Sequence, residues 1–183
     1  MFTNDKRQAE RTGKYGTPRQ DHLQQIVSQF QDPTQTLEIK LKLLSNLSNF
    51  SYDPYNFPFL RNLNVLELFL DHLSDPDHRL AEFAAAGICN AAADPANARF
   101  IVDCGGVPAL VACLSSPVGG NTVMYAIASL FYLCECGGGV VEEVRKAEVV
   151  EVVERLAESG EGCVSVRNVA RVLLDKYLRH GGC

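Results

Sequence analysis

The sequence lacks the features of a membrane or secreted protein. Its 183 residues contain no uninterrupted apolar run near the ~20 residues that a spanning helix needs, and no basic segment followed by an apolar one opens the chain. The seven cysteines are an odd number and lie mostly within apolar runs, which is typical of reduced, buried thiols. We therefore expect a soluble, intracellular protein whose sequons at Asn46 and Asn49 are not glycosylated.

Positive charge is also scarce. The chain has 17 lysines and arginines against 22 aspartates and glutamates, a formal net charge of -5, so it has no general attraction to nucleic acid. Any RNA contact is expected to be indirect. The acidic residues between 142 and 158 are interleaved with basic ones, as on a solvated helix face, although a basic partner segment could use them. Residues 1–18 are almost free of apolar side chains and are expected to form a flexible polar tail.

Groupings typical of catalytic, metal and nucleotide sites are missing as well. Cys134-x-Cys136 has no second cysteine pair, and the four histidines are scattered along the chain. The run "CGGGVVEEVRK" that begins at Cys136 lacks the Gly-Lys-Ser/Thr ending of a phosphate-binding loop. No motif pairs a candidate nucleophile with a general base. We predict a non-enzymatic protein without metal or cofactor.

What the sequence does contain is an internal repeat of about 41 residues. The segments "NFSYDPYN" (49–56) and "NAAADPAN" (90–97) share Asn, Asp-Pro and Asn at this spacing. An apolar stripe at i, i+3, i+4 and i+7, typical of an amphipathic helix, recurs at about the same interval. Its members are Leu66, Phe69, Leu70 and Leu73, then Val107, Leu110, Val111 and Leu114, then Val149, Val152, Val153 and Leu156. Three copies of one helix predict an all-α repeat protein.

Proline marks the expected helix starts. Five pairs place Asp or Ser before proline, which puts a side-chain acceptor at the N-cap and proline at the first helical position. The pairs at 32–33, 75–76 and 116–117 are expected to open long helices, and those at 53–54 and 94–95 shorter ones. Each unit is therefore predicted to hold a short, a medium and a long helix.

These signals predict a single helical domain over residues 19–179. Because such units cannot bury their apolar faces alone, they are expected to stack into a solenoid with atypical ends. The first helix, near 19–31, is expected to face inward through Leu23, Ile26, Val27 and Phe30. The predicted parts are, in order, a cap at 19–52, repeats at about 53–93, 94–135 and 136–179, and a C-terminal end at 180–183.

The segments "GICNAAADPANARFIVDCGG" (87–106) and "GGVPALVACLSSP" (105–117) resemble the armadillo repeat. The resemblance implies a right-handed superhelical solenoid of about three three-helix repeats plus an N-terminal helical cap, with the long third helices lining a concave groove. In that family an asparagine at the place of Asn49 and Asn90 commonly hydrogen-bonds the backbone of an extended peptide; the third unit has Tyr132 instead. Import receptors of the family also use tryptophans to hold lysine stems, and this chain has none.

A longer run, "NLSNFSYDPYNFPFLRNLNVLELFLDHLSD" (46–75), is similar to the small armadillo repeat-containing protein seven family, over most of residues 20–179. Members of that family pair with an RNA-binding-motif protein carrying an RNA-recognition domain and act in the minor spliceosome. The resemblance therefore implies a nuclear protein-interaction scaffold for pre-mRNA splicing. The alternative is a generic armadillo adaptor that binds extended peptides in signalling or transport.

The expected partner-binding groove comprises Asn46, Asn49, Ala86, Asn90 and Tyr132. The asparagines also have a structural interpretation, because helix-end asparagines satisfy backbone carbonyls and caps. The sequence leaves both interpretations open.

Overall fold

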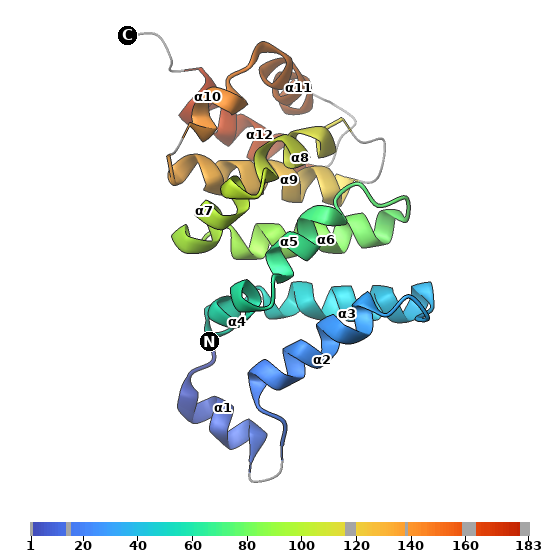
Figure 1. The fold of residues 1–183 in the computed structure, drawn as a ribbon. Coiled ribbons are helices and arrows are strands. Elements are labelled where there is room, and N and C mark those ends of the chain that lie inside the picture. Colours follow the sequence, from blue (N-terminus) through green and yellow to red (C-terminus); the bar gives the residue numbers. More distant parts are fainter. Residues whose placement is uncertain (1, 14–15, 116–119, 138, 159–163, 180–183) are drawn as a thin grey trace.

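The computed structural model of the protein describes residues 2–13, 16–115, 120–137, 139–158 and 164–179. Every regular element in these ranges is a helix (Figure 1), which confirms the all-α prediction. The elements are α1 (Asp5–Thr12), α2 (Arg19–Gln31), α3 (Leu37–Phe50), the 3-10 turn η1 (Pro54–Asn56), α4 (Phe57–Asn62), α5 (Val65–Asp71), α6 (His78–Ala91), α7 (Pro95–Asp103), α8 (Gly106–Cys113), α9 (Gly120–Glu135), α10 (Val140–Val144), α11 (Ala147–Glu158), α12 (Val164–Leu173) and the π-helical turn η2 (Leu174–Leu178).

The helices stack in one direction as a solenoid. Figure 1 shows the long helices α3, α6, α9 and α12 one above another, and each packs against the next. A second row, made of α2, α5, α8 and α11, packs against the ladder helices. Short helices α4, α7 and α10 lie between one long helix and the next second-row helix. We call the exposed side of the four long helices, with the loops at their C-terminal ends, the ladder face.

The core follows the predicted apolar stripes. All four inward residues expected on α2 are buried. In the first two copies of the repeated stripe, the first and last positions are buried at Leu66 and Leu73 and again at Val107 and Leu114, whereas the third position is half-buried. The third copy instead buries Val149 and Val153 and leaves Leu156 half-buried. Leu110 is fully buried. The stripes therefore seal the two rows against each other, as the hydrophobic effect requires of units that are unstable alone.

The described helices are all short compared with a membrane-spanning helix. The longest element, α9, has 16 residues. Within the described ranges, no single helix has both the length and the composition to cross a membrane; the pair α7 and α8 has them only jointly, with a bend of 87° between its members.

The helix-start signals were correct for the short helices and wrong for two long ones. Asp53 and Asp94 cap η1 and α7 through their side chains, as predicted. Asp32 instead ends α2 and accepts a hydrogen bond from the Thr34 N–H, so α3 starts four residues later than the pair predicted, with Thr36 as its cap. Asp75 likewise accepts from the Asp77 N–H, and Asp77 caps α6. An Asx turn thus takes the place of the N-cap. The pair at 116–117 lies outside the described residues.

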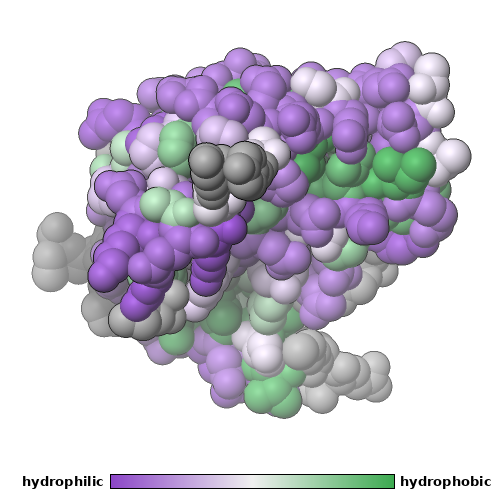
Figure 2. Space-filling model, turned by 90° about the horizontal axis from the view of Figure 1, so that it is seen from below, coloured by the Kyte–Doolittle hydropathy of each residue, from purple (hydrophilic) through white to green (hydrophobic). Residues whose placement is uncertain are grey.

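Residues 1–18, which we expected to form a flexible polar tail, include the helix α1. Asn4 caps it by accepting from the Arg7 N–H, and none of its residues is buried. The absence of apolar periodicity hid this helix, because its start depends on the cap rather than on packing. Figure 2 shows the end of the solenoid that carries α1 and α2: the surface is mainly hydrophilic, with apolar areas between the polar side chains. A polar outer face suits a terminal cap.

Candidate functional site

The repeated Asp-Pro-x-Asn segment follows the C-terminal ends of the ladder helices α3 and α6. The amide of Asn56 donates to the Phe50 carbonyl at 2.8 Å, and that of Asn97 donates to the Ala91 carbonyl at 3.1 Å. Both asparagines are buried. Each ties the next short helix to a carbonyl at the end of the preceding long helix, which otherwise has no intrahelical partner. The asparagine that follows Asp-Pro in this segment, Asn56 or Asn97, is therefore structural.

Replacing Asn97 by alanine is expected to lower the free energy of unfolding by about 1–2 kcal/mol, because its buried hydrogen bond to the Ala91 carbonyl is lost while that carbonyl keeps the Asp94 N–H, at 3.2 Å, as a donor. The Arg61 guanidinium, which donates to the Asn97 side-chain oxygen, would lose this acceptor too. Urea denaturation measures the change. The control is Asn62→Ala on α4, an exposed position; equal losses in both variants would contradict this role.

Asn90, one of the predicted groove residues, bridges two ladder helices. Its amide donates to the Ser48 carbonyl of α3 at 3.1 Å, and that carbonyl also accepts from the Ser51 hydroxyl at 2.6 Å. Asn49 is exposed, and its side chain has no hydrogen-bond partner among the described residues. The two aligned asparagines therefore differ: one is already engaged and the other is free.

Asn90→Ala is expected to cost about 1 kcal/mol of stability, because a hydrogen bond between half-buried groups is lost while Ser48 keeps a second donor. Asn49→Ala serves as the matched control and should change stability by less than about 0.5 kcal/mol. Thermal melts followed by circular dichroism compare the two. A larger loss for Asn49→Ala would refute the assignment of the structural role to Asn90.

Tyr132 lies where three hollows of the ladder face meet. The first, of about 430 Å³, is lined by Asn90, Tyr132 and the aromatic residues Phe2 and Tyr52, among others. The second, of about 950 Å³, runs between the start of α7 and the end of α9. The third, of about 250 Å³, lies between α9 and α12. Because Tyr132 lines all three, its ring is the shared wall of one extended groove.

The remaining predicted residues lie beside this groove without lining any of the three hollows. Asn46 is half-buried one turn before Asn49 on α3, and Ala86 is half-buried one turn before Asn90 on α6. The structure thus brings Asn90 and Tyr132 together, and it places Asn46, Asn49 and Ala86 on the adjoining stretch of the same ladder.

The charges along the groove are mostly paired. Asp94 forms an ion pair with Arg61 at 3.3 Å. Glu135 pairs with Lys176, and it also accepts from the Tyr177 hydroxyl. These donors lower the pKa of the Glu135 carboxyl. Arg99 on α7 lines the 950 Å³ hollow, is exposed, and makes no ion pair or hydrogen bond with any residue that the structure describes.

The cysteines near the groove are poorly suited to chemistry. Burial raises the pKa of Cys89 to about 11 and that of Cys134 to about 12, so both thiols are protonated at neutral pH and are weak nucleophiles and ligands. In the part of the chain with described placement, no three His, Cys, Asp or Glu side chains gather as a metal site.

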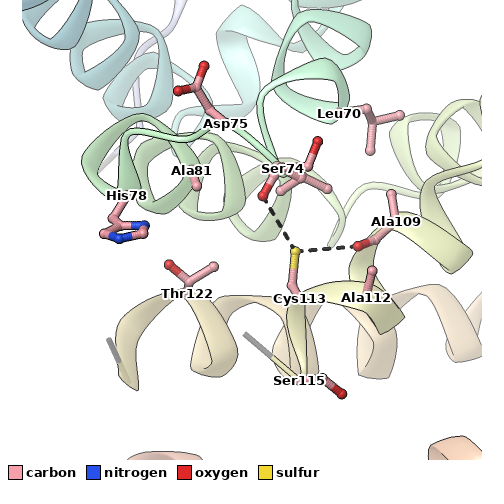
Figure 3. A pocket seen from close by; sticks show the side chains of 11 residues that line it. Leu70, Ser74, Asp75, His78, Ala81, Ala109, Ala112, Cys113, Ser115 and Thr122 are labelled. Atoms are coloured by element: carbon pink, nitrogen blue, oxygen red, sulfur yellow. Dashed lines mark hydrogen bonds between the residues drawn. The ribbon is translucent and has the colours of Figure 1, made fainter. Parts of the chain in front are cut away.

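A separate hollow of about 530 Å³ lies between the α5–α6 and α8–α9 turns (Figure 3). Cys113 points across it and contacts the carbonyls of Ala109 and Leu73 at 3.3 and 3.9 Å. Burial raises the pKa of this thiol, and the Asp75 carboxylate is bonded to the Asp77 N–H at 2.8 Å. The described lining of this 530 Å³ hollow therefore presents no activated nucleophile.

Several lining residues of the groove were not predicted from the sequence. Phe2 lies outside the repeat, Tyr52 aligns with Ala93 rather than with another aromatic residue, and Phe131, Arg99 and Val172 were assigned no role. The usable signal was the aromatic residue Tyr52 in a loop position, since exposed aromatic residues favour interfaces. Phe2 gave no signal, because its position depends on a contact 50 residues away in sequence.

Comparison with known proteins identifies the family. Residues 94–135, which form α7 to α9, match the family model described as Armadillo/beta-catenin-like repeat. The chain is 39% identical to mouse armadillo repeat-containing protein 7 over 159 residues, which are 87% of this chain and 78% of that relative. The chain belongs to the armadillo repeat-containing protein 7 family. This result confirms the resemblance drawn from the sequence.

Solved structures of armadillo type share the fold. A designed armadillo repeat protein superposes with a TM-score of 0.73 at 18% identity, covering 84% of this chain and 63% of that one. An engineered protein gives a TM-score of 0.71 at 20% identity, covering 81% and 59%. A further designed armadillo repeat protein, solved in complex with the peptide (KR)4, gives 0.73 at 15% identity, covering 85% and 64%. The chain thus spans under two thirds of each of these solved proteins, and the armadillo solenoid prediction is confirmed.

Proposed function

We propose that this protein is a non-enzymatic, nuclear scaffold that supports pre-mRNA splicing in the minor spliceosome by holding an RNA-binding-motif protein with an RNA-recognition domain. The observation that carries the proposal is the 39% identity to armadillo repeat-containing protein 7 over 87% of the chain. The splicing role is what resemblance to that family implies.

Two features of the molecule support a scaffold role. The ladder face offers adjoining hollows lined by half-exposed aromatic rings, a composition enriched at protein interfaces. The net charge of -5 disfavours direct capture of RNA, so RNA contact would pass through the partner.

Affinity purification of the tagged protein from nuclear extract tests the proposal, with identification of both proteins and small nuclear RNAs. We expect one protein with an RNA-recognition domain together with the minor-class spliceosomal RNAs. A matched purification of the Leu110→Asp variant, in which the solenoid is disrupted, should recover neither. Recovery of only cytoplasmic, peptide-bearing partners by the wild-type protein would refute the splicing role.

A generic adaptor for extended peptides is the second candidate, and the free Asn49 side chain favours it. A designed armadillo repeat protein binds the basic peptide (KR)4. In this chain, however, the carboxylates Asp94 and Glu135 along the groove are already paired with Arg61 and Lys176. Binding of short peptides that is lost in Asn49→Ala would favour the adaptor.

A further inference from the structure

Residues 2–12 are fastened to the edge of the ladder face. The backbone N–H of Thr3 donates to both carboxylate oxygens of Asp53, at 3.0 and 3.3 Å. The Phe2 ring lies 5.9 Å from the Tyr52 ring. Figure 1 shows the N-terminal end of the chain beside α4. Both partner residues belong to the loop that follows α3.

The same segment is held at two further points. Arg7 donates to the Phe2 carbonyl at 2.8 Å, which fixes the chain before α1. Arg19, at the start of α2, donates to the Gln8 side chain at 2.9 Å. These contacts place Phe2 at a defined position on the solenoid.

Asp53 serves two structures at once, because it also caps η1 by accepting from the Tyr55 N–H at 3.2 Å. Burial acts to raise the pKa of this carboxyl, but the hydrogen bonds from Thr3 and Tyr55 outweigh it and the pKa is lowered. The carboxylate is therefore ionised at neutral pH and remains an acceptor for the Thr3 N–H.

Phe2 forms a wall of the 430 Å³ hollow rather than a plug in it. Phe2 is 53% exposed, Tyr52 67% and Tyr132 38%, so the three rings border a hollow that stays open. A segment that occupied the groove as a substitute ligand would instead bury its aromatic ring, because burial of that apolar area provides the binding energy.

The 430 Å³ hollow is lined mainly by apolar groups, and the charge left unpaired among the described residues of the adjoining 950 Å³ hollow is the positive charge of Arg99. Of the charged residues that line the 430 and 950 Å³ hollows, Asp94 and Glu135 are neutralised by Arg61 and Lys176. Arg99 is the lining cation that has no partner within the described ranges. A partner segment that fits this pattern presents a bulky apolar side chain with a carboxylate beside it.

We propose that residues 2–12 are a built-in part of the docking surface, with Phe2, Tyr52 and Tyr132 receiving a bulky apolar side chain of a protein partner and Arg99 pairing with an acidic residue next to it. The inference rests on the proposed scaffold function, whose docking surface and partner chemistry it specifies.

The probe is a synthetic capped peptide, Gly-Ser-Trp-Ser-Asp-Gly-Ser, titrated into the isotope-labelled full chain and followed by NMR. We expect shift changes centred on Tyr52, Asn90 and Tyr132. A control peptide with Lys in place of Asp should bind about threefold more weakly, as for a partly exposed ion pair. Arg99→Glu should reverse this preference, whereas Arg155→Glu, on exposed α11 surface, should not. Shift changes confined to other surfaces, or equal binding of both peptides, would overturn the proposal.

Variants of residues 2–12 test whether Phe2 forms part of the docking surface or occupies the hollow in place of a partner. Phe2→Ala should weaken peptide binding about fivefold, less than the loss of a fully buried interface anchor, because the Phe2 ring is half-exposed. Asp53→Asn, which keeps an N-cap acceptor but removes the charge that holds Thr3, should weaken it similarly. Leu37→Ala, at another exposed apolar residue, on α3, should have no effect. Tighter binding in Phe2→Ala, or no change, would overturn the proposal.

These experiments use no splicing component, so the two proposals fail separately. Absence of an RNA-recognition-domain partner from the nuclear purification would remove the splicing role and leave the peptide result intact. Failure of the peptide tests would remove this docking surface and leave the splicing partner to another face.

Discussion

Leu110→Asp is expected to abolish the cooperative fold. Leu110 is fully buried on α8, inside the stripe that seals the second row against the ladder. An unpaired carboxylate there loses its hydration and gains no partner, a cost of several kcal/mol against a total stability of about 5–15 kcal/mol. Circular dichroism should show reduced helix content and no cooperative melting transition.

The matched control for this substitution is Ala112→Asp, two residues further along the same helix at an exposed position. It should melt cooperatively, with a stability change within about 1 kcal/mol. If Leu110→Asp melted like the control, α8 would not pack as the structure shows.

Phe69→Ala is expected to destabilise the protein by about 3–5 kcal/mol, the usual cost of removing a buried aromatic ring. The Phe69 ring is fully buried between α5 and α6. It lies so close to Gly87 that a Cβ there would come within 2.5 Å of two ring atoms. The ring therefore occupies the space that a side chain at position 87 would need, and its removal leaves a cavity beside a residue that has no side chain of its own.

Chemical denaturation of Phe69→Ala beside Phe59→Ala measures this effect. Phe59 is only half-buried on α4 and should lose clearly less stability. Similar losses in the two variants would contradict the close approach of α5 to α6. Gly87→Ala should also destabilise the protein, because the ring has no free volume into which to move.

The fold was largely readable from the sequence because the repeat uses local signals. The inward stripe on α2 and the repeated stripe through Leu110 depend only on helical periodicity. The caps at Asp53 and Asp94 depend on residues within three positions. Local patterns of this kind agree with the tertiary packing, so they predict it.

The errors arose where two local arrangements compete or where a distant contact decides. Asp32 and Asp75 form Asx turns instead of caps, because Thr36 and Asp77 provide later acceptors for the helix starts. α1 was missed because it buries no residue. The position of Phe2 depends on the loop after α3, which no periodicity within residues 1–18 encodes.

The candidate site likewise has features that local sequence patterns predict and features that depend on distant contacts. Asn90 and Tyr132 were predicted because they occupy repeated positions; the structure places both in the lining of one hollow, and their role in binding stays a prediction. The sequence could not tell that Asn90 is engaged with Ser48 while Asn49 is free, since that difference depends on the spacing between α3 and α6. The charge of Arg99 becomes informative only once the neighbouring carboxylates are seen to be paired.

Hydrogen exchange on a purified complex with the proposed RNA-recognition-domain partner tests whether that partner docks on the ladder face. Binding slows amide exchange where the partner covers or rigidifies the backbone. We predict slower exchange in the segments around Tyr52, Asn90 and Tyr132, with unchanged exchange in α10 and α11. Protection confined to α8 and α11, with the ladder face unaffected, would place the partner on the opposite row of helices and refute docking on the ladder face.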